Sequence, residues 1–238
     1  SEYYAAWCWK ANGTGSSNTS GSINTAATSA NTTSGFSIVA YEGSGSADAT
    51  IGHGLGVKPD MIWFKNRETA GTNWTIFHKA VGAEDFTIFN GNNAAFDWTA
   101  ALNDTDPTTT LITLGDADNT NQSAKDIVAY CFASVQGFSK FGTYKGNGNA
   151  DGTFIYTGFR PAFVICKRTD STQNWMMFDN KRLGYNEENE YLEINNTIAE
   201  LSNVPIDLLS NGFKHRHTST SVNASGGTYI FMAVAEAP

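Results

Sequence analysis

A tryptophan in a polar stretch is the first candidate for chemistry in this sequence. Trp98 follows Asp97 and lies shortly after Asn92 and Asn93, in a segment with no obvious counterpart later in the chain. An aromatic face can stack on a sugar ring while nearby amides and carboxylates bind the sugar hydroxyl groups. These four residues form a candidate carbohydrate site. The alternative is that Trp98 packs on a satellite of the core.

An Asp/Asn-rich loop is the second candidate. Asp116, Asp118 and Asn121 lie close together in residues 115–121, and their oxygens would suit a hard cation such as Ca²⁺. The loop lacks the terminal bidentate Glu and the fixed Gly of an EF-hand. A polar turn without an ion is therefore the favoured interpretation. We expect no cofactor, with Ca²⁺ as the alternative.

Two further groups could support catalysis. His53 and His78 could act as an acid/base pair if the fold brings them together, and Glu187, Glu188 and Glu190 could supply a glycosidase carboxylate pair. Clustered like charges are more often a solvated loop. The sequence holds no nucleophile elbow, zinc-protease or phosphate-loop motif. We therefore expect a protein that is not an enzyme.

The elements that would position these residues occur twice. Pro59–Arg67 is an apolar run closed by a lysine and followed by Asn73 and Trp74, and Pro161–Thr169 is followed in the same way by Asn174 and Trp175. The offset of about a hundred residues is far longer than a solenoid period and indicates a duplicated unit. The recurrence of Trp74 and Trp175 favours a core or inter-sheet role over a sugar platform.

The boundaries of the repeated units are predicted from the apolar strand that ends each unit and from composition. Similar apolar runs occur at 3–9, 127–133 and 229–235, three copies against two of the central segment. We therefore predict that residues 1–10 are the closing strand of a preceding repeat, or a strand that completes the first unit. Residues 11–35 are mostly Gly, Ser, Thr, Asn and Ala, which predicts a linker or surface loop. The two units are predicted at 36–136 and 137–238.

Short apolar runs separated by turn residues predict an all-β fold. Only 16% of the residues are charged and 23 are glycines, which is typical of β proteins with long polar loops. Ser210, Asn211 and Gly212 predict a tight hairpin. The fold class predicted is two tandem β-sandwich units, jelly-roll-like, that arose by internal duplication. The other predicted strands of the first unit are 73–81, 84–90, 108–114 and 126–135.

Charge and cysteines exclude some partners. A net charge of −8 argues against nucleic acids and anionic membranes, which favour clustered Lys and Arg. The short basic run at 214–217 indicates a solvated turn and strand. Cys8, Cys131 and Cys166 lie in apolar runs, where cysteine acts as a small hydrophobic residue, so neither a zinc site nor a disulfide framework is expected. No segment is apolar enough for membrane insertion, and the N-terminus lacks a signal peptide.

Four segments carry a resemblance to a known family: Tyr4–Gly13, His53–Asp60, Tyr156–Pro161 and Ser225–Ile230. Through them the chain resembles repeat-bearing virion proteins of marine bacteriophages, described as tail or tail-fibre-like structural proteins. The resemblance runs through nearly the whole chain and implies a component of the phage particle surface. It implies assembly in the bacterial cytoplasm, display on the virion, and copies of itself or other virion proteins as partners. It supplies no catalytic residues.

Three functions follow as hypotheses. The first is a non-enzymatic virion component, part of a tail fibre or a particle-surface module, that contacts host surface polysaccharide. The second is a carbohydrate-binding module of a secreted or surface marine protein. The third is a polysaccharide hydrolase or lyase, which would need a carboxylate pair or a His/Tyr pair in a cleft.

Overall fold

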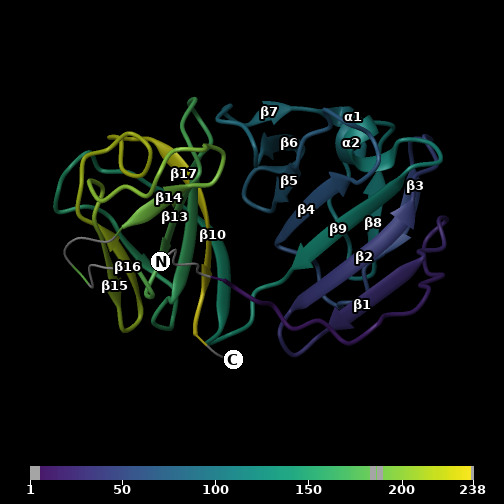
Figure 1. The fold of residues 1–238 in the computed structure, drawn as a ribbon, viewed down its shortest axis with the longest axis horizontal. Helices are drawn as coiled ribbons and strands as arrows, with labels where there is room; N and C mark the ends of the chain where they lie inside the picture. Colours follow the sequence, from purple (N-terminus) through teal and green to yellow (C-terminus); the bar gives the residue numbers. More distant parts are fainter. Residues whose placement is uncertain (1–5, 183–185, 187–189, 237–238) are drawn as a thin grey trace.

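The computed structural model describes residues 6–182, 186 and 190–236 of the chain. Within them the fold is all-β, which confirms the predicted fold class, and two β-sandwich units lie side by side (Figure 1). Two short helices, α1 (Thr99–Leu102) and α2 (Asp118–Asn121), lie in the first unit. None of the described helices is long and apolar enough to span a bilayer.

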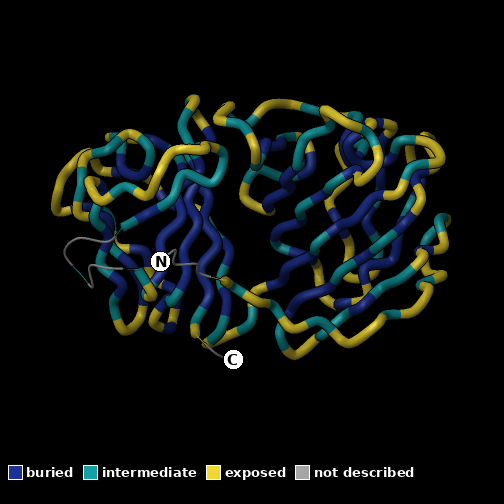
Figure 2. Tube along the Cα trace, viewed as in Figure 1, coloured by how far each residue is buried: buried dark blue, intermediate teal, exposed yellow. Residues whose placement is uncertain are grey.

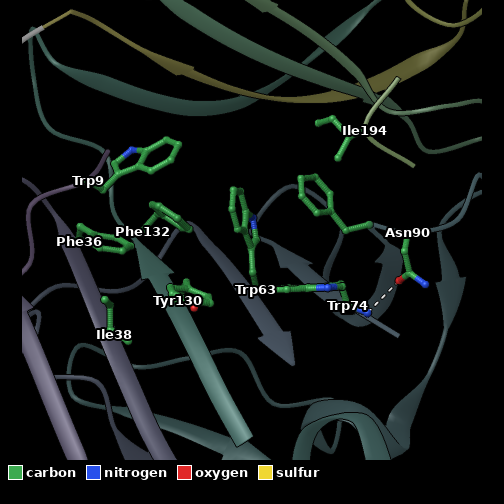
Figure 3. Close-up of a pocket in the computed structure, with 10 residues that line it drawn as sticks. Trp9, Phe36, Ile38, Trp63, Trp74, Asn90, Tyr130, Phe132 and Ile194 are labelled. Atoms are coloured by element: carbon green, nitrogen blue, oxygen red, sulfur yellow. Dashed lines mark hydrogen bonds between the residues drawn. The ribbon is translucent and has the colours of Figure 1, made fainter. Parts of the chain in front are cut away.

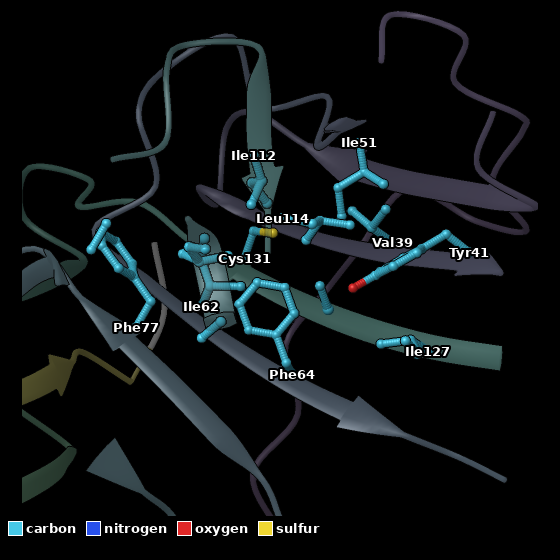
Figure 4. Packing of buried hydrophobic residues seen from close by; sticks show 14 of the residues in the cluster. Val39, Tyr41, Ile51, Ile62, Phe64, Phe77, Ile112, Leu114, Ile127 and Cys131 are labelled. Atoms are coloured by element: carbon cyan, nitrogen blue, oxygen red, sulfur yellow. The ribbon is translucent and has the colours of Figure 1, made fainter. Parts of the chain in front are cut away.

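The first unit packs a large sheet against a small one. The large sheet has the order β1-β2-β9-β4-β5-β6-β7, and the small sheet pairs β3 with β8. Their bounds are β1 Ala27–Asn31, β2 Phe36–Glu42, β3 Ala49–Gly52, β4 Met61–Asn66, β5 Thr75–His78, β6 Gly82–Ile88, β7 Phe96–Asp97, β8 Leu111–Leu114 and β9 Asp126–Phe132. In β4, Ile62 and Phe64 point into the core between the sheets because successive side chains alternate in direction (Figure 4).

The second unit has the same plan. Its main sheet has the order β10-β17-β12-β13-β14, and a smaller sheet has the order β11-β16-β15. Their bounds are β10 Ser139–Lys145, β11 Phe154–Tyr156, β12 Phe163–Arg168, β13 Met176–Asp179, β14 Tyr191–Glu193, β15 Ile206–Leu209, β16 Gly212–His215 and β17 Thr228–Val234. The predicted hairpin is confirmed, since Leu209 pairs with Gly212 across Ser210 and Asn211.

The main sheets of the two units correspond strand by strand. The order β2-β9-β4-β5-β6 in the first unit equals β10-β17-β12-β13-β14 in the second. Register agrees as well, since Met61 pairs with Phe132 and Phe163 pairs with Val234. The two units therefore share one topology, and their origin by duplication remains a prediction.

Part of the predicted linker is a strand. Within residues 11–35, β1 pairs with β2 from Ala27 opposite Ala40 to Asn31 opposite Phe36. The peptide hydrogen bonds of a sheet edge are available to Ser, Thr and Ala as much as to apolar residues, and β-branched Thr favours extended backbone. Composition alone therefore gave the wrong structure for residues 27–31.

The prediction of a strand at the N-terminus is wrong for the described residues 6–10, which belong to no strand. Trp9 instead packs between the two units, with ring centroids 6.0 Å from Phe132 and 5.7 Å from Phe163. Residues 1–5 lie outside the described part of the chain. The aromatic side chains of this segment are used in packing between the units rather than in a sheet.

Three apolar clusters hold the molecule together. One fills each sandwich, and the third joins the outer faces of the two main sheets, where Ile76, Trp175 and Met232 are all fully buried or nearly so. Figure 2 shows buried strands in both units beneath largely exposed loops. The two units therefore pack against each other through apolar residues on strand faces that solvent would otherwise cover.

The three cysteines differ in environment, contrary to their common interpretation as small hydrophobic residues. Cys8 is exposed, whereas Cys131 and Cys166 are buried. Burial raises the pKa of each buried thiol to about 12, and the thiolate is the reactive form. We expect Ellman's reagent to label Cys8 alone in the native protein and all three thiols in denaturant. Rapid labelling of a second thiol in the native state would contradict this burial.

Candidate functional site

An aromatic cavity lies between the two units. Its volume is about 510 Å³, within the range of about 300–1,000 Å³ that is usual for ligand pockets. Its walls are formed by side chains of both units and of the N-terminal segment (Figure 3). The lining residues are Trp9, Phe36, Ile38, Trp63, Trp74, Phe89, Asn90, Tyr130, Phe132 and Ile194. We call this space the inter-unit cavity.

Strand alternation places most of this lining. Ile38 on β2, Trp63 on β4 and Tyr130 on β9 all point away from the first core, because their neighbours along each strand point into it. The outer face of an antiparallel sandwich is usually polar. Here the second unit covers part of the outer face of the first main sheet. The inter-unit cavity is the space over this face that side chains of the second unit do not fill.

Two aromatic rings form a platform in the inter-unit cavity. Trp74 stacks near Tyr130 with centroids 6.2 Å apart and an interplanar angle of 22°. Asn90 holds the backbone of Trp74 in position, because its Oδ1 accepts a hydrogen bond of 2.9 Å from the Trp74 backbone N–H. The amide of Asn90 also donates to Asn73 at 2.9 Å. Trp74 is therefore held in place by its backbone while its ring stays half-buried.

Trp63 forms the adjoining wall. Its ring lies 4.9 Å from Phe89 and 4.8 Å from Phe132 by centroid distance. The indole Nε1 of Trp63 is buried and has no hydrogen-bond partner among the described residues. A buried polar group without a partner is uncommon and calls for an explanation. Because solvent does not reach this atom, it belongs to the packing of the wall rather than to the surface that a ligand in the cavity would contact.

The equivalent tryptophan of the second unit has a different role. Trp175 is 1% exposed, its Nε1 donates to the Ile88 carbonyl at 2.9 Å, and its ring meets Phe89 edge-on at 4.9 Å. The core or inter-sheet role predicted for both tryptophans thus holds for Trp175. Trp74 lines the inter-unit cavity, so equal positions in the two units do not imply equal surroundings.

Trp98 and Asp97 lie elsewhere. The Trp98 ring packs on the first core, edge-on to Phe86 at 6.2 Å and stacked with Phe96 at 5.8 Å. Asp97 is exposed on β7, opposite Asp85. Neither residue lines the inter-unit cavity, and the packing alternative describes the environment of Trp98 best.

Asn92 and Asn93 are exposed in the segment that docks on the second unit. The Asn92 carbonyl accepts hydrogen bonds from the Gln173 backbone at 2.9 Å and from Lys167 Nζ at 3.3 Å. Nearby, the Ala95 backbone donates to the Thr169 carbonyl at 2.8 Å. The backbone of this segment therefore joins the units, and the structure does not group these amides with the aromatic cavity.

The proposed calcium ligands do not converge. Asp116 and Asp118 are exposed, whereas Asn121 is fully buried. Its Oδ1 accepts from the Ser44 backbone at 2.8 Å, and its amide donates to the Ser46 and Gly115 carbonyls. Residues 118–121 form α2 rather than an open loop, and within the described residues no three His, Cys, Asp or Glu side chains gather as a metal site.

The two histidines do not form a pair. His53 Nε2 lies 3.3 Å from the Thr108 carbonyl, whereas His78 Nε2 lies 3.4 Å from the Phe231 carbonyl of the second unit. Burial lowers the pKa of both, that of His78 to about 4. Both are structural in this arrangement. The predicted carboxylates Glu187 and Glu188 lie outside the described residues, and Glu190 precedes β14.

The basic run at 214–217 is neutralised by acidic neighbours. Lys214 and Arg216 bind Asp151 at 2.6 and 3.0 Å, and Arg216 also approaches Asp207 at 3.5 Å. Lys214 and Arg216 thus reach solvent, but His215 between them is fully buried, so the prediction of a solvated turn and strand is wrong for His215.

One feature of the sequence could have indicated the inter-unit cavity. Trp63, Trp74 and Tyr130 would all lie on outward positions of predicted strands, and several large aromatic residues on such positions indicate a covered or ligand-binding face.

The whole chain, residues 1–238, matches a protein family described as a domain of unknown function (DUF7483). The chain therefore belongs to that family. No curated protein and no solved structure matches it.

Proposed function

We propose that this member of the DUF7483 family is a non-enzymatic binding module of a phage particle surface, and that its inter-unit cavity binds a sugar ring of a host surface polysaccharide. The observation that carries the proposal is the aromatic platform of Trp74 and Tyr130. The virion context rests on the resemblance to marine phage tail proteins.

The chemistry of the inter-unit cavity suits a pyranose ring. The C–H face of a sugar packs on an aromatic ring, and its hydroxyl groups need hydrogen-bond partners. Tyr130 and Trp74 lie in this lining, and neither the Tyr130 hydroxyl nor the Trp74 indole N–H bonds to another described residue. These groups would orient the ring on the platform.

The lining favours binding over hydrolysis. Among the described residues it contains one amide, that of Asn90, and one phenol, that of Tyr130, and no Asp, Glu or His. A glycosidase would need two carboxyl groups about 5–9 Å apart across the scissile bond. The same cavity would serve a carbohydrate-binding module of a secreted protein equally well.

Replacement of Trp74 tests this proposal. We expect Trp74→Ala to weaken binding to a panel of bacterial surface polysaccharides by at least about tenfold, because the stacking platform is lost. Trp98→Ala is the matched control and should leave affinity within about twofold. Binding is measured by calorimetry or glycan array, with reducing-end release assayed in parallel.

Each outcome separates the hypotheses. Loss in the Trp98 variant with retention in the Trp74 variant would move the site to residues 92–98. No binding by the wild-type chain to any polysaccharide would overturn the proposal. Release of reducing ends or unsaturated products would establish the enzyme hypothesis instead.

A further inference from the structure

The two units differ at one edge of their main sheets. In the first unit, β1 covers the outer edge of β2. In the second unit, β10 pairs with β17, and no other described strand pairs with β10. Only residues 133–138 separate β9 from β10, and they cover just the start of this edge. Val135 forms an isolated bridge with Ser139, and the Phe141 N–H donates to the Ser134 hydroxyl at 3.3 Å.

The register shows which backbone groups remain open. Tyr41 on β2 and Tyr144 on β10 are equivalent, since each buries its ring in its own core and donates its hydroxyl to a backbone carbonyl. Ala40 therefore corresponds to Thr143. The Ala40 carbonyl accepts a hydrogen bond of 2.8 Å from the Ala26 backbone. The peptide groups of Thr143 have no such partner among the described residues.

The second sheet of each sandwich shows the same contrast. In the first unit, the Ile23 backbone donates to the Thr50 carbonyl of β3 at 2.9 Å, and the Ser22 backbone donates to the Thr50 hydroxyl at 2.8 Å. The N-terminal segment thus covers the edges of both β2 and β3. The corresponding strand of the second unit, β11, pairs with β16 and with no other described strand.

Exposed aromatic side chains flank this open edge. Phe154 and Tyr156 on β11 are 43% and 59% exposed. They line a groove of about 220 Å³ together with Lys140 and Thr143 of β10. Lys140 Nζ donates to the Tyr156 carbonyl at 2.8 Å and lies 5.0 Å from the Tyr156 ring centroid, and a flexible lysine can move aside. Large exposed aromatics beside free peptide groups are typical of a binding edge.

We propose that the β10 edge around Thr143, beyond the residues that Ser134 and Val135 cover, binds a short extended strand of another polypeptide, antiparallel to β10. The partner is of the chemistry that the first unit already uses, a segment rich in Ser, Thr, Ala and Asn and free of charge, like residues 12–31. Peptide hydrogen bonds to Thr143 supply the register, and small side chains fit beneath Phe154 and Tyr156. The positive charges of Lys140 and Lys145 disfavour a basic strand.

A synthetic peptide with the sequence of residues 12–35 provides the test. Added to the intact chain, it should slow amide hydrogen exchange at Thr143 by at least about tenfold and leave exchange within β17 unchanged. Thr143→Pro removes the outward N–H at an edge position that tolerates proline. It should abolish the protection, whereas Thr143→Val, which keeps the N–H, should retain it.

Two results would overturn the proposal. One is unchanged exchange at Thr143 with the peptide at millimolar concentration. The other is a wild-type dimer in which Thr143 is protected without peptide and exposed again in Thr143→Pro, since the occupant would then be the β10 edge of a second copy. Exchange in the wild-type chain decides the question even if the proline variant fails to fold.

Discussion

Replacing Asn223 with Ala is expected to lower the free energy of unfolding by about 3–5 kcal/mol. Asn223 is fully buried. Its Oδ1 accepts from the Asn147 backbone at 2.9 Å, and its amide donates to the Asn149 and His217 carbonyls at 2.8 and 3.0 Å. Removing the side chain leaves these partly buried loop groups without their shared partner. Urea unfolding followed by far-UV circular dichroism measures the loss.

The first unit also has a buried asparagine that binds the backbone of its loops, and this residue provides a matched comparison. Asn121 there accepts from the Ser44 backbone and donates to the Ser46 and Gly115 carbonyls. Asn121→Ala should therefore cost a similar amount, whereas the exposed Asn93→Ala should change stability by less than about 0.5 kcal/mol. Equal, small effects in all three variants would contradict the structural role of the buried amides.

Acidification from pH 7 to pH 4 is expected to lower stability by about 3 kcal/mol through His215 alone. Burial lowers the pKa of His215 to about 3, against about 6.5 in an unfolded chain. Between these values the unfolded state binds a proton that the native state excludes. The stability that the native state gains by keeping His215 neutral is present in full above about pH 6.5. It is lost as the pH falls toward 3.

Hydrogen bonding explains why the native state excludes this proton. Tyr144 has one hydroxyl proton, which it donates to the Val222 carbonyl at 2.9 Å. The 2.9 Å contact between the same hydroxyl and His215 Nε2 then assigns the Nε2–H tautomer to His215. Nδ1 is buried without a partner among the described residues. Protonation would create an N–H there with no acceptor, and Phe178 and Phe213 surround the ring.

Two variants isolate this effect. His215→Phe removes the titrating group and should reduce the pH dependence of the unfolding free energy by about 3 kcal/mol between pH 7 and pH 4. Phe178→Leu perturbs the same packing without a change in titration, so it should lower stability and keep the wild-type pH dependence. An unchanged pH dependence in His215→Phe would show that the histidine does not control acid unfolding.

The two main sheets share one topology, but their outer faces at the inter-unit cavity differ. The outer face of the second main sheet presents Trp175, Met177 and Met232, all buried in the junction. The outer face of the first presents Trp63 and Tyr130, which are only partly buried. One face thus supplies a rigid apolar contact, and the other retains open aromatic surface beside it.

Local patterns in the sequence were sufficient for the fold class. The apolar run around Ile62 and Phe64 and the Asn211-Gly212 turn act within a few residues, and they led to the correct strand and hairpin. The recurrence of the Asn-Trp segment placed equivalent strands in both units. Composition failed at residues 27–31, because an edge strand is stabilised by the peptide groups of its neighbour and needs few apolar side chains.

The candidate site depended on the tertiary structure. The sequence drew attention to Trp98 for its polar neighbours, but its ring packs on Phe86 and the first core. By repetition Trp74 and Trp175 were equivalent, and only the packing of one unit on the other buries Trp175 and leaves Trp74 beside a cavity. Local sequence fixes which face of a strand a side chain occupies. Contacts between distant segments determine what covers that face.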